Sequence, residues 1–106
     1  MINMLNQFTL VGRVKEIPVI KTTSQGNTVA SLVVECDRSF RNSDGTLQKD
    51  VFNITLWKGI AQTCADCCKL NDPIAIKGRM QDIVYQKDEH YYHNVELIAE
   101  KVSFIN

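Results

Sequence analysis

The chain has 106 residues, of which 44% are hydrophobic and 23% charged, as in an ordinary globular protein. No apolar run approaches the roughly 18 residues that span a bilayer, and residues 1–6 lack the basic and apolar regions of a signal peptide. We therefore expect residues 1–106 to form one cytoplasmic domain with a modest core and no contact with a membrane.

Basic and acidic residues balance, with 12 of each. This balance excludes a strong, uniform attraction to nucleic acid, although it permits a local basic patch. Several acidic residues lie outside the segments that carry the aromatic residues: Asp66, Asp72, Asp88, Glu96 and Glu100. We therefore expect the charges to be separated by face, and any nucleic-acid binding to be modest and sensitive to salt.

Strand patterns dominate the first half of the chain. Three segments alternate apolar and polar residues and predict strands: 8–15, 28–37 and 51–58. Gly12 interrupts the first, as a bend or bulge requires, and Pro18 excludes a regular central strand at its position. Turn residues occupy 24–27, and 42–45 reads as a flexible hairpin loop.

The hydrophobic period changes over residues 59–70, where Ile60 and the cysteines recur every three or four residues. This spacing predicts one short helix, which Asn71-Asp72-Pro73 ends. Strands are predicted again over 74–86, with a bend at Gly78, and over 91–105.

The predicted order is three strands, a helix and two strands. A closed barrel satisfies this order because closure removes exposed strand edges. The sequence therefore predicts an all-β protein: a five-stranded OB-fold barrel with one short helix between the third and fourth strands. The open face of this fold commonly binds oligonucleotides.

Strand alternation assigns each side chain to an inner or an outer face. Three phenylalanines are assigned to the core: Phe8, Phe52 and Phe104. Trp57 falls on the outer face of its strand, and so does Tyr85, provided that Gly78 does not shift the alternation. Arg38 and Phe40 are assigned to the side opposite the apolar residues of their strand.

Aromatic and basic residues thus share the surface outside the core. Cations neutralise phosphates and rings stack on unpaired bases, so this combination is typical of a site for single-stranded nucleic acid. The candidate DNA-binding residues are the rings Phe40, Trp57 and Tyr85 and the cations Arg13, Lys15, Lys21, Arg38, Arg41, Lys49, Lys58, Lys77 and Arg79.

Neither catalysis nor a cofactor is expected. The chain shows no paired carboxylates on adjacent strand positions, no nucleophile with a histidine nearby in sequence, and no phosphate-binding loop. Four cysteines are interpreted as free thiols that fill small spaces in the core, not as metal ligands: Cys36, Cys64, Cys67 and Cys68. His90 and His93 are expected on a hairpin surface.

Several segments match, in order and spacing, those of one family: Leu10–Val14 with Pro18, Asp37–Phe40 with Asn42 and Gly45, Asn53–Trp57, and Lys77–Met80 with Tyr85. From Leu5 to Phe104 the chain resembles the bacterial single-stranded DNA-binding protein family. The resemblance implies an OB-fold that assembles as a homotetramer and wraps single-stranded DNA without sequence preference. It implies a nucleoid-associated role in DNA replication, recombination, repair or transformation.

The family's stacking aromatics map onto Phe40, Trp57 and Tyr85, whereas a fourth maps onto Val51. A basic residue of the family is replaced by Ile83. The family's acidic tail, which recruits replication and repair enzymes, has no counterpart here, so partners that depend on it are not expected. The chain is then either a tailless paralogue or a shortened form. The alternative interpretation is an OB-fold protein-interaction module similar to the primosomal replication protein N.

Overall fold

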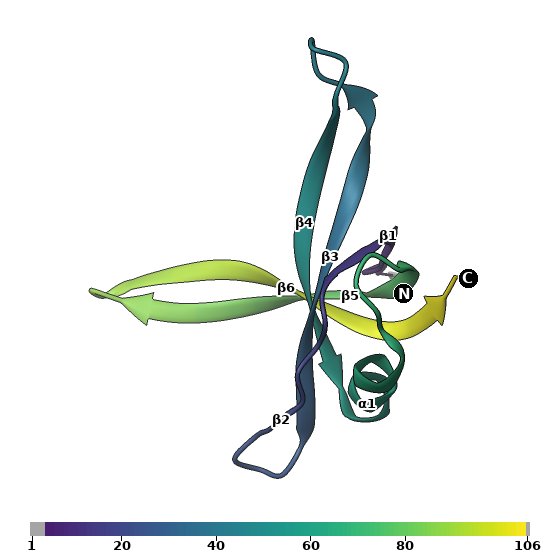
Figure 1. Ribbon diagram of the computed structural model, residues 1–106. Helices are drawn as coiled ribbons and strands as arrows, with labels where there is room; N and C mark the ends of the chain where they lie inside the picture. The colour runs from purple at the N-terminus through teal and green to yellow at the C-terminus, as the bar shows by residue number, and fades with distance from the viewer. Residues whose placement is uncertain (1–3, 106) are drawn as a thin grey trace.

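The computed structural model describes residues 4–105 (Figure 1). Its elements are β1 (Phe8–Glu16), β2 (Lys21–Thr22), β3 (Thr28–Arg41), β4 (Leu47–Trp57), α1 (Lys58–Cys67), β5 (Pro73–Lys87) and β6 (His90–Phe104). The predicted strands and helix are all present. The third predicted strand begins four residues early, at Leu47, so 42–46 form only the tip of a long hairpin. The two-residue strand β2 was not predicted.

Five of the strands form a closed barrel. β1 pairs with both β3 and β5, β5 pairs with β6, β6 with β4, and β4 with β3. The contact between β4 and β6 is parallel and joins only Ile54 to Leu97 and Thr55 to Ile98, whereas the other pairings are antiparallel. With α1 between β4 and β5, this is the predicted OB-fold arrangement.

The barrel interior is filled by branched aliphatic side chains. Those that are fully buried include Leu32, Val34, Ile54, Leu56, Ile74 and Ile76, which confirms the predicted inner faces. α1 closes one end by burying Ala61 and Cys64. Phe8 and Phe52 pack against this core as predicted. The assignment of Phe104 to the core is wrong: at the end of β6 it stays 37% exposed beside the segment that follows α1.

Two glycines let neighbouring strands approach closely. A Cβ on Gly12 would lie 2.5 Å from the backbone oxygen of Glu35, and a Cβ on Gly78 would overlap the backbone oxygen of Ile98. The β5–β6 register shifts at Gly78, as the sequence predicted. The β1–β3 register shifts between Val14 and Glu16, two residues beyond Gly12.

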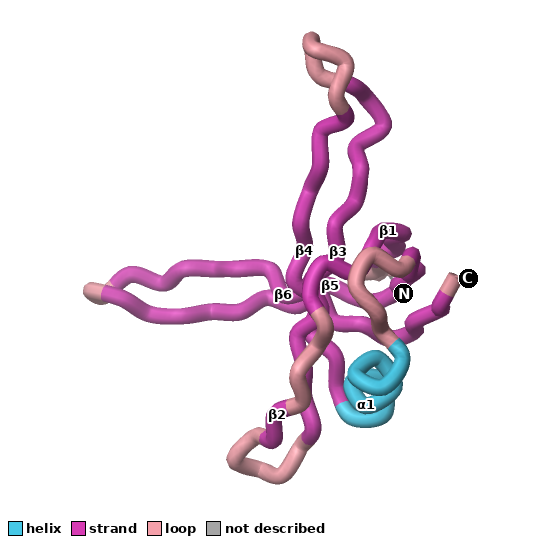
Figure 2. The backbone as a smooth tube through the Cα atoms, in the orientation of Figure 1, coloured by secondary structure: helices cyan, strands magenta, loops and turns pink. Residues whose placement is uncertain are grey.

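Two hairpins extend beyond the barrel as arms that point in different directions (Figures 1 and 2). The β3–β4 arm ends in the turn at 42–46, and the β5–β6 arm ends at Asp88 and Glu89, which both have positive φ. Residues 80–95 of the second arm are exposed on both of its faces. The arms therefore offer surface that the barrel itself does not bury. Within the described part of the chain, no helix has the length and apolar character needed to cross a membrane.

Candidate nucleic-acid interface

A continuous two-strand surface lies on the outside of the barrel and runs into the first arm. We call it the β3–β4 outer face; it consists of Val29, Ser31, Val33, Glu35 and Asp37 on β3, and Trp57, Thr55, Asn53, Val51 and Lys49 directly opposite them on β4. Directly opposed residues of antiparallel strands project to the same side. At about 3.4 Å per residue, the surface from Lys49 to Trp57 is about 27 Å long.

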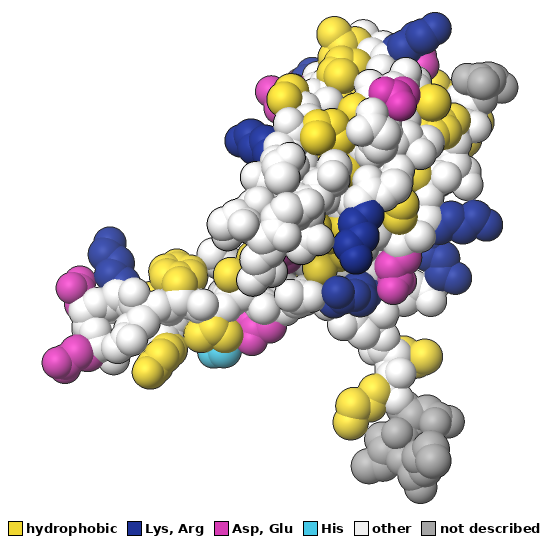
Figure 3. All heavy atoms as spheres, turned by 90° about the horizontal axis from the view of Figure 1, so that it is seen from below, with side chains coloured by type: hydrophobic (Ala, Val, Ile, Leu, Met, Phe, Trp, Pro, Cys, Tyr) yellow, Lys and Arg dark blue, Asp and Glu magenta, His cyan; other side chains and the backbone are white. Residues whose placement is uncertain are grey.

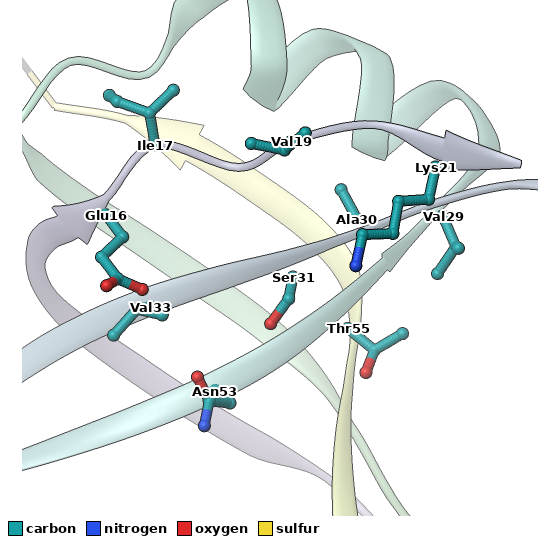
Figure 4. Close-up of a pocket in the computed structure, with 10 residues that line it drawn as sticks. All are labelled: Glu16, Ile17, Val19, Lys21, Val29, Ala30, Ser31, Val33, Asn53 and Thr55. Atoms are coloured by element: carbon teal, nitrogen blue, oxygen red, sulfur yellow. The ribbon is translucent and has the colours of Figure 1, made fainter.

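A groove of about 380 Å³ lies over part of this face. Figure 4 shows Ser31, Asn53 and Thr55 on its floor, with Ile17 and Val19 from the connection between β1 and β2 above them. The groove thus combines apolar walls with hydroxyl and amide groups. Such a lining accepts flat, partly polar groups and provides hydrogen-bonding partners for their edges.

The predicted stacking residues are exposed but do not converge. Trp57 ends β4 and is 36% exposed, Phe40 lies in the first arm and is 60% exposed, and Tyr85 lies in the second arm and is 45% exposed. Phe40 is 11 residues beyond Val29, the partner of Trp57, so roughly 35 Å of strand separates the two rings. The arrangement suits an extended polymer better than a single small molecule.

Tyr85 has an aromatic partner that the sequence analysis left unassigned. Tyr85 and Tyr92 are opposed on β5 and β6, and their rings stack with centroids 5.3 Å apart and planes 21° from parallel. His90 meets Tyr92 edge-on at 6.5 Å. Because neighbouring residues of a strand point to opposite sides, Tyr91 lies on the other face of this arm, with His93. Two rings therefore form one platform near the tip of the arm.

The assignment of Arg38 to the side opposite the apolar residues of β3 is wrong. Arg38 lies two residues after Cys36, and Asp50 is directly opposite Cys36. Nε and Nη2 of Arg38 donate hydrogen bonds to Oδ2 and Oδ1 of Asp50 at 2.9 and 2.7 Å. Arg38 thus continues the inner face beyond the end of the barrel. The β3–β4 register shifts between Asp37 and Arg41, where Phe40 lies, so strand alternation does not assign Phe40 to either side.

Two further candidate cations share one carboxylate. Lys15 and Lys49 approach Glu35 at 3.3 and 3.2 Å. These two lysines hold the pKa of the Glu35 carboxyl below its ordinary value, and Arg38 does the same for Asp50. Neither pairing was predicted, because Glu35 and Asp50 lie within the segments that carry the aromatic residues, where no acidic residue was expected to matter. Strand alternation does place Glu35 on the same outer face as Ser31 and Val33, and this pattern could have predicted a carboxylate on that face.

The remaining candidate cations differ in how they are held. Arg13 donates to the backbone oxygen of Asn71, Arg41 to that of Gly45, and Arg79 to the side chain of Gln81. Three lysines form no ion pair within the described residues: Lys21, Lys58 and Lys77. Figure 3 shows basic side chains scattered among acidic ones, without a continuous basic band on the face in view. Glu35 and Asp37 share the β3–β4 outer face with Lys49, so the charges are not separated by face as predicted.

The cysteines fulfil their predicted packing role with one exception. Cys64 and Cys68 are buried and Cys36 packs against the core, whereas Cys67 is exposed. Burial raises the pKa of the Cys64 thiol to about 12. Among residues 4–105 no three His, Cys, Asp or Glu side chains are grouped closely enough to hold a metal ion.

Comparison with known proteins shows to which protein family the chain is related. Residues 5–105 match the model of the single-strand binding protein family. The chain belongs to that family. It is 34% identical over 104 residues to single-stranded DNA-binding protein B of Bacillus subtilis, and this match covers 97% of the chain and 92% of the relative. It is 31% identical to single-stranded DNA-binding protein 1 of Staphylococcus aureus, of which it spans 66%.

A solved structure of the single-stranded DNA binding protein from Thermus aquaticus, a deletion mutant, superposes with a TM-score of 0.78. The match covers 96% of this chain and 51% of that one at 21% identity, and it shows the shared OB-fold. The chain also spans only 61% of the Bacillus cereus relative, to which it is 30% identical. The likeness to the solved structure therefore concerns the fold of the barrel, and the surface features described above are those of this chain.

Proposed function

We propose that this protein is a non-enzymatic binder of single-stranded DNA that makes little distinction between sequences. The observation that carries the proposal is the exposure of Trp57, Phe40 and Tyr85 outside the core, each within a surface that also bears cations. Membership of the single-strand binding protein family supports it, as do the names of the relatives. These names do not favour the alternative of a module that binds only proteins.

In this proposal the DNA follows the β3–β4 outer face from Trp57 towards Lys49 and continues over the two arms. Bases stack on Trp57, on Phe40 and on the platform formed by Tyr85 and Tyr92. The candidate cations, among them Lys58, which follows Trp57 directly, neutralise phosphates. Stacking and charge neutralisation tolerate every base, so no sequence preference results.

We also propose that the protein assembles as a homotetramer. A single domain offers a short path and carries zero net charge, so linking several domains on one strand raises the effective concentration of each later contact. Val11, Val51 and Ile83 are exposed apolar residues and candidates for subunit contacts. Light scattering across a dilution series tests this proposal: a particle of 12.0 kDa at micromolar concentration contradicts it.

The proposed site of action is the cytoplasm, at the nucleoid, where single strands arise during replication, recombination, repair or uptake of DNA. Fluorescence anisotropy of a labelled oligo-thymidine, compared with a duplex of the same length, tests the binding proposal. We expect the single strand to bind more tightly, and Tyr85→Ala to weaken binding. Tyr91→Ala is the matched control because its ring is exposed on the other face of the same arm. Equal affinity for single strand and duplex would contradict the proposal.

A further inference from the structure

A single carboxylate, that of Glu35, forms ion pairs with two of the lysines that are candidates for binding phosphate. The Oε2 atom of Glu35 lies 3.3 Å from Nζ of Lys15 on β1, and its Oε1 atom lies 3.2 Å from Nζ of Lys49 on β4. Each carboxylate oxygen therefore takes one ammonium group. The side chain of Glu35 is 20% exposed, whereas each lysine is 55% exposed, so the lysines remain accessible from solvent while they are paired.

This cluster lies within the surface proposed to bind DNA. Glu35 is opposite Val51 in the β3–β4 pairing and opposite Arg13 in the β1–β3 pairing. It also lines a hollow together with Arg13, Asp37 and Lys49. A phosphate that approaches either lysine therefore meets the negative charge of Glu35 at the same place.

We propose that Glu35 is an internal competitor of DNA: it occupies Lys15 and Lys49 in the free protein, and DNA phosphates must replace it on both. The proposal rests on the proposed function, since it assumes that single-stranded DNA follows this face. Glu35 thereby sets how tightly the strand is held and how strongly salt weakens that hold.

Two physical effects give the expected sign. Exposed ion pairs are weak, so phosphates can displace the carboxylate, but its charge then stays beside them and opposes binding. That charge also offsets part of the charge of the two lysines, so fewer of the DNA's condensed cations are released on binding and the salt dependence is weaker. The Arg38–Asp50 pair repeats the arrangement at the base of the first arm, where a carboxylate again holds a candidate cation.

The variant Glu35→Gln keeps the shape and removes the charge. The matched control is Glu100→Gln, which removes the same charge from an exposed residue beside α1, away from this face. The measurement is the affinity for a labelled oligo-thymidine between 50 and 200 mM salt, with circular dichroism to verify folding. Glu35→Gln should bind more tightly at low salt, and the slope of log K against log salt should steepen by about 0.7, because the substitution removes one negative charge.

With a slope change of about 0.7, the advantage of Glu35→Gln shrinks about 2.6-fold over this fourfold rise in salt. Glu35→Gln/Lys49→Ala should lose part of the added slope. A folded Glu35→Gln protein with the wild-type slope and affinity, or with weaker binding, overturns the inference while leaving the proposed function intact. Failure of the wild-type protein to bind at any of these salt concentrations contradicts the proposed function itself.

Discussion

Gly78→Ala should destabilise the protein because the new methyl group has no space. Its Cβ would overlap the backbone oxygen of Ile98 and lie 2.8 Å from Cε1 of Phe8. The Phe8 ring can rotate away, but the oxygen belongs to the β6 backbone, so β5 and β6 must separate where their register shifts. Overpacking of this kind costs about 1–3 kcal/mol. A loss of 2 kcal/mol corresponds to a fall in Tm of roughly 8–16 °C for a domain of this size.

Thermal unfolding followed by circular dichroism measures this effect at one fixed protein concentration. Gly59→Ala is the matched control, because a Cβ at Gly59 meets nothing within 4 Å and alanine favours the helix in which it lies. We expect the control to be neutral or to stabilise by up to about 1 kcal/mol. A Tm for Gly78→Ala within about 2 °C of wild type would show that the strands are not this close, and that the arm carrying Tyr85 leaves the barrel differently.

Three further predictions concern single side chains. Trp57→Ala should weaken binding of oligo-thymidine by about 1–3 kcal/mol and Trp57→Phe by less, because a smaller ring still stacks; equal losses in anisotropy titrations would contradict stacking. Val51→Trp should strengthen binding, since it adds a ring to the β3–β4 outer face; weaker binding by a folded variant would place Val51 at a subunit contact. At pH 8, an aromatic disulfide reagent should label the exposed Cys67 rapidly, whereas Cys64, whose pKa burial raises to about 12, should react only after unfolding; rapid labelling of Cys64 would refute its burial.

The barrel was predictable because its signals are local. Alternation in 28–37 and 51–58 fixed the inner faces of β3 and β4, and Gly78 marked the bend at which an arm begins. The error at Phe104 has a different origin. Alternation shows to which side a residue points, but not that the barrel ends there, and the last residue of β6 therefore stays exposed.

The interface was less predictable because its charges are paired across strands. Lys15, Glu35 and Lys49 come from three different strands, so their contact depends on barrel closure and not on any local pattern. The contact of Arg38 with Asp50 likewise depends on the β3–β4 register. This register shifts between Asp37 and Arg41, where β3 has two more residues than β4. Sequence reasoning therefore selected the cations as candidate DNA-binding residues but treated them as free of ion pairs.

Titration of tryptophan emission with oligo-thymidine at two salt concentrations tests the central claim most directly. Trp57 is the only tryptophan in the chain, so the signal reports one position on the proposed path. We predict saturable quenching that requires more DNA at the higher salt concentration, because bases stack on the ring and phosphates replace salt ions. Unchanged emission at saturating DNA, with binding established independently by anisotropy, would contradict the account and remove the β3–β4 outer face from the DNA path.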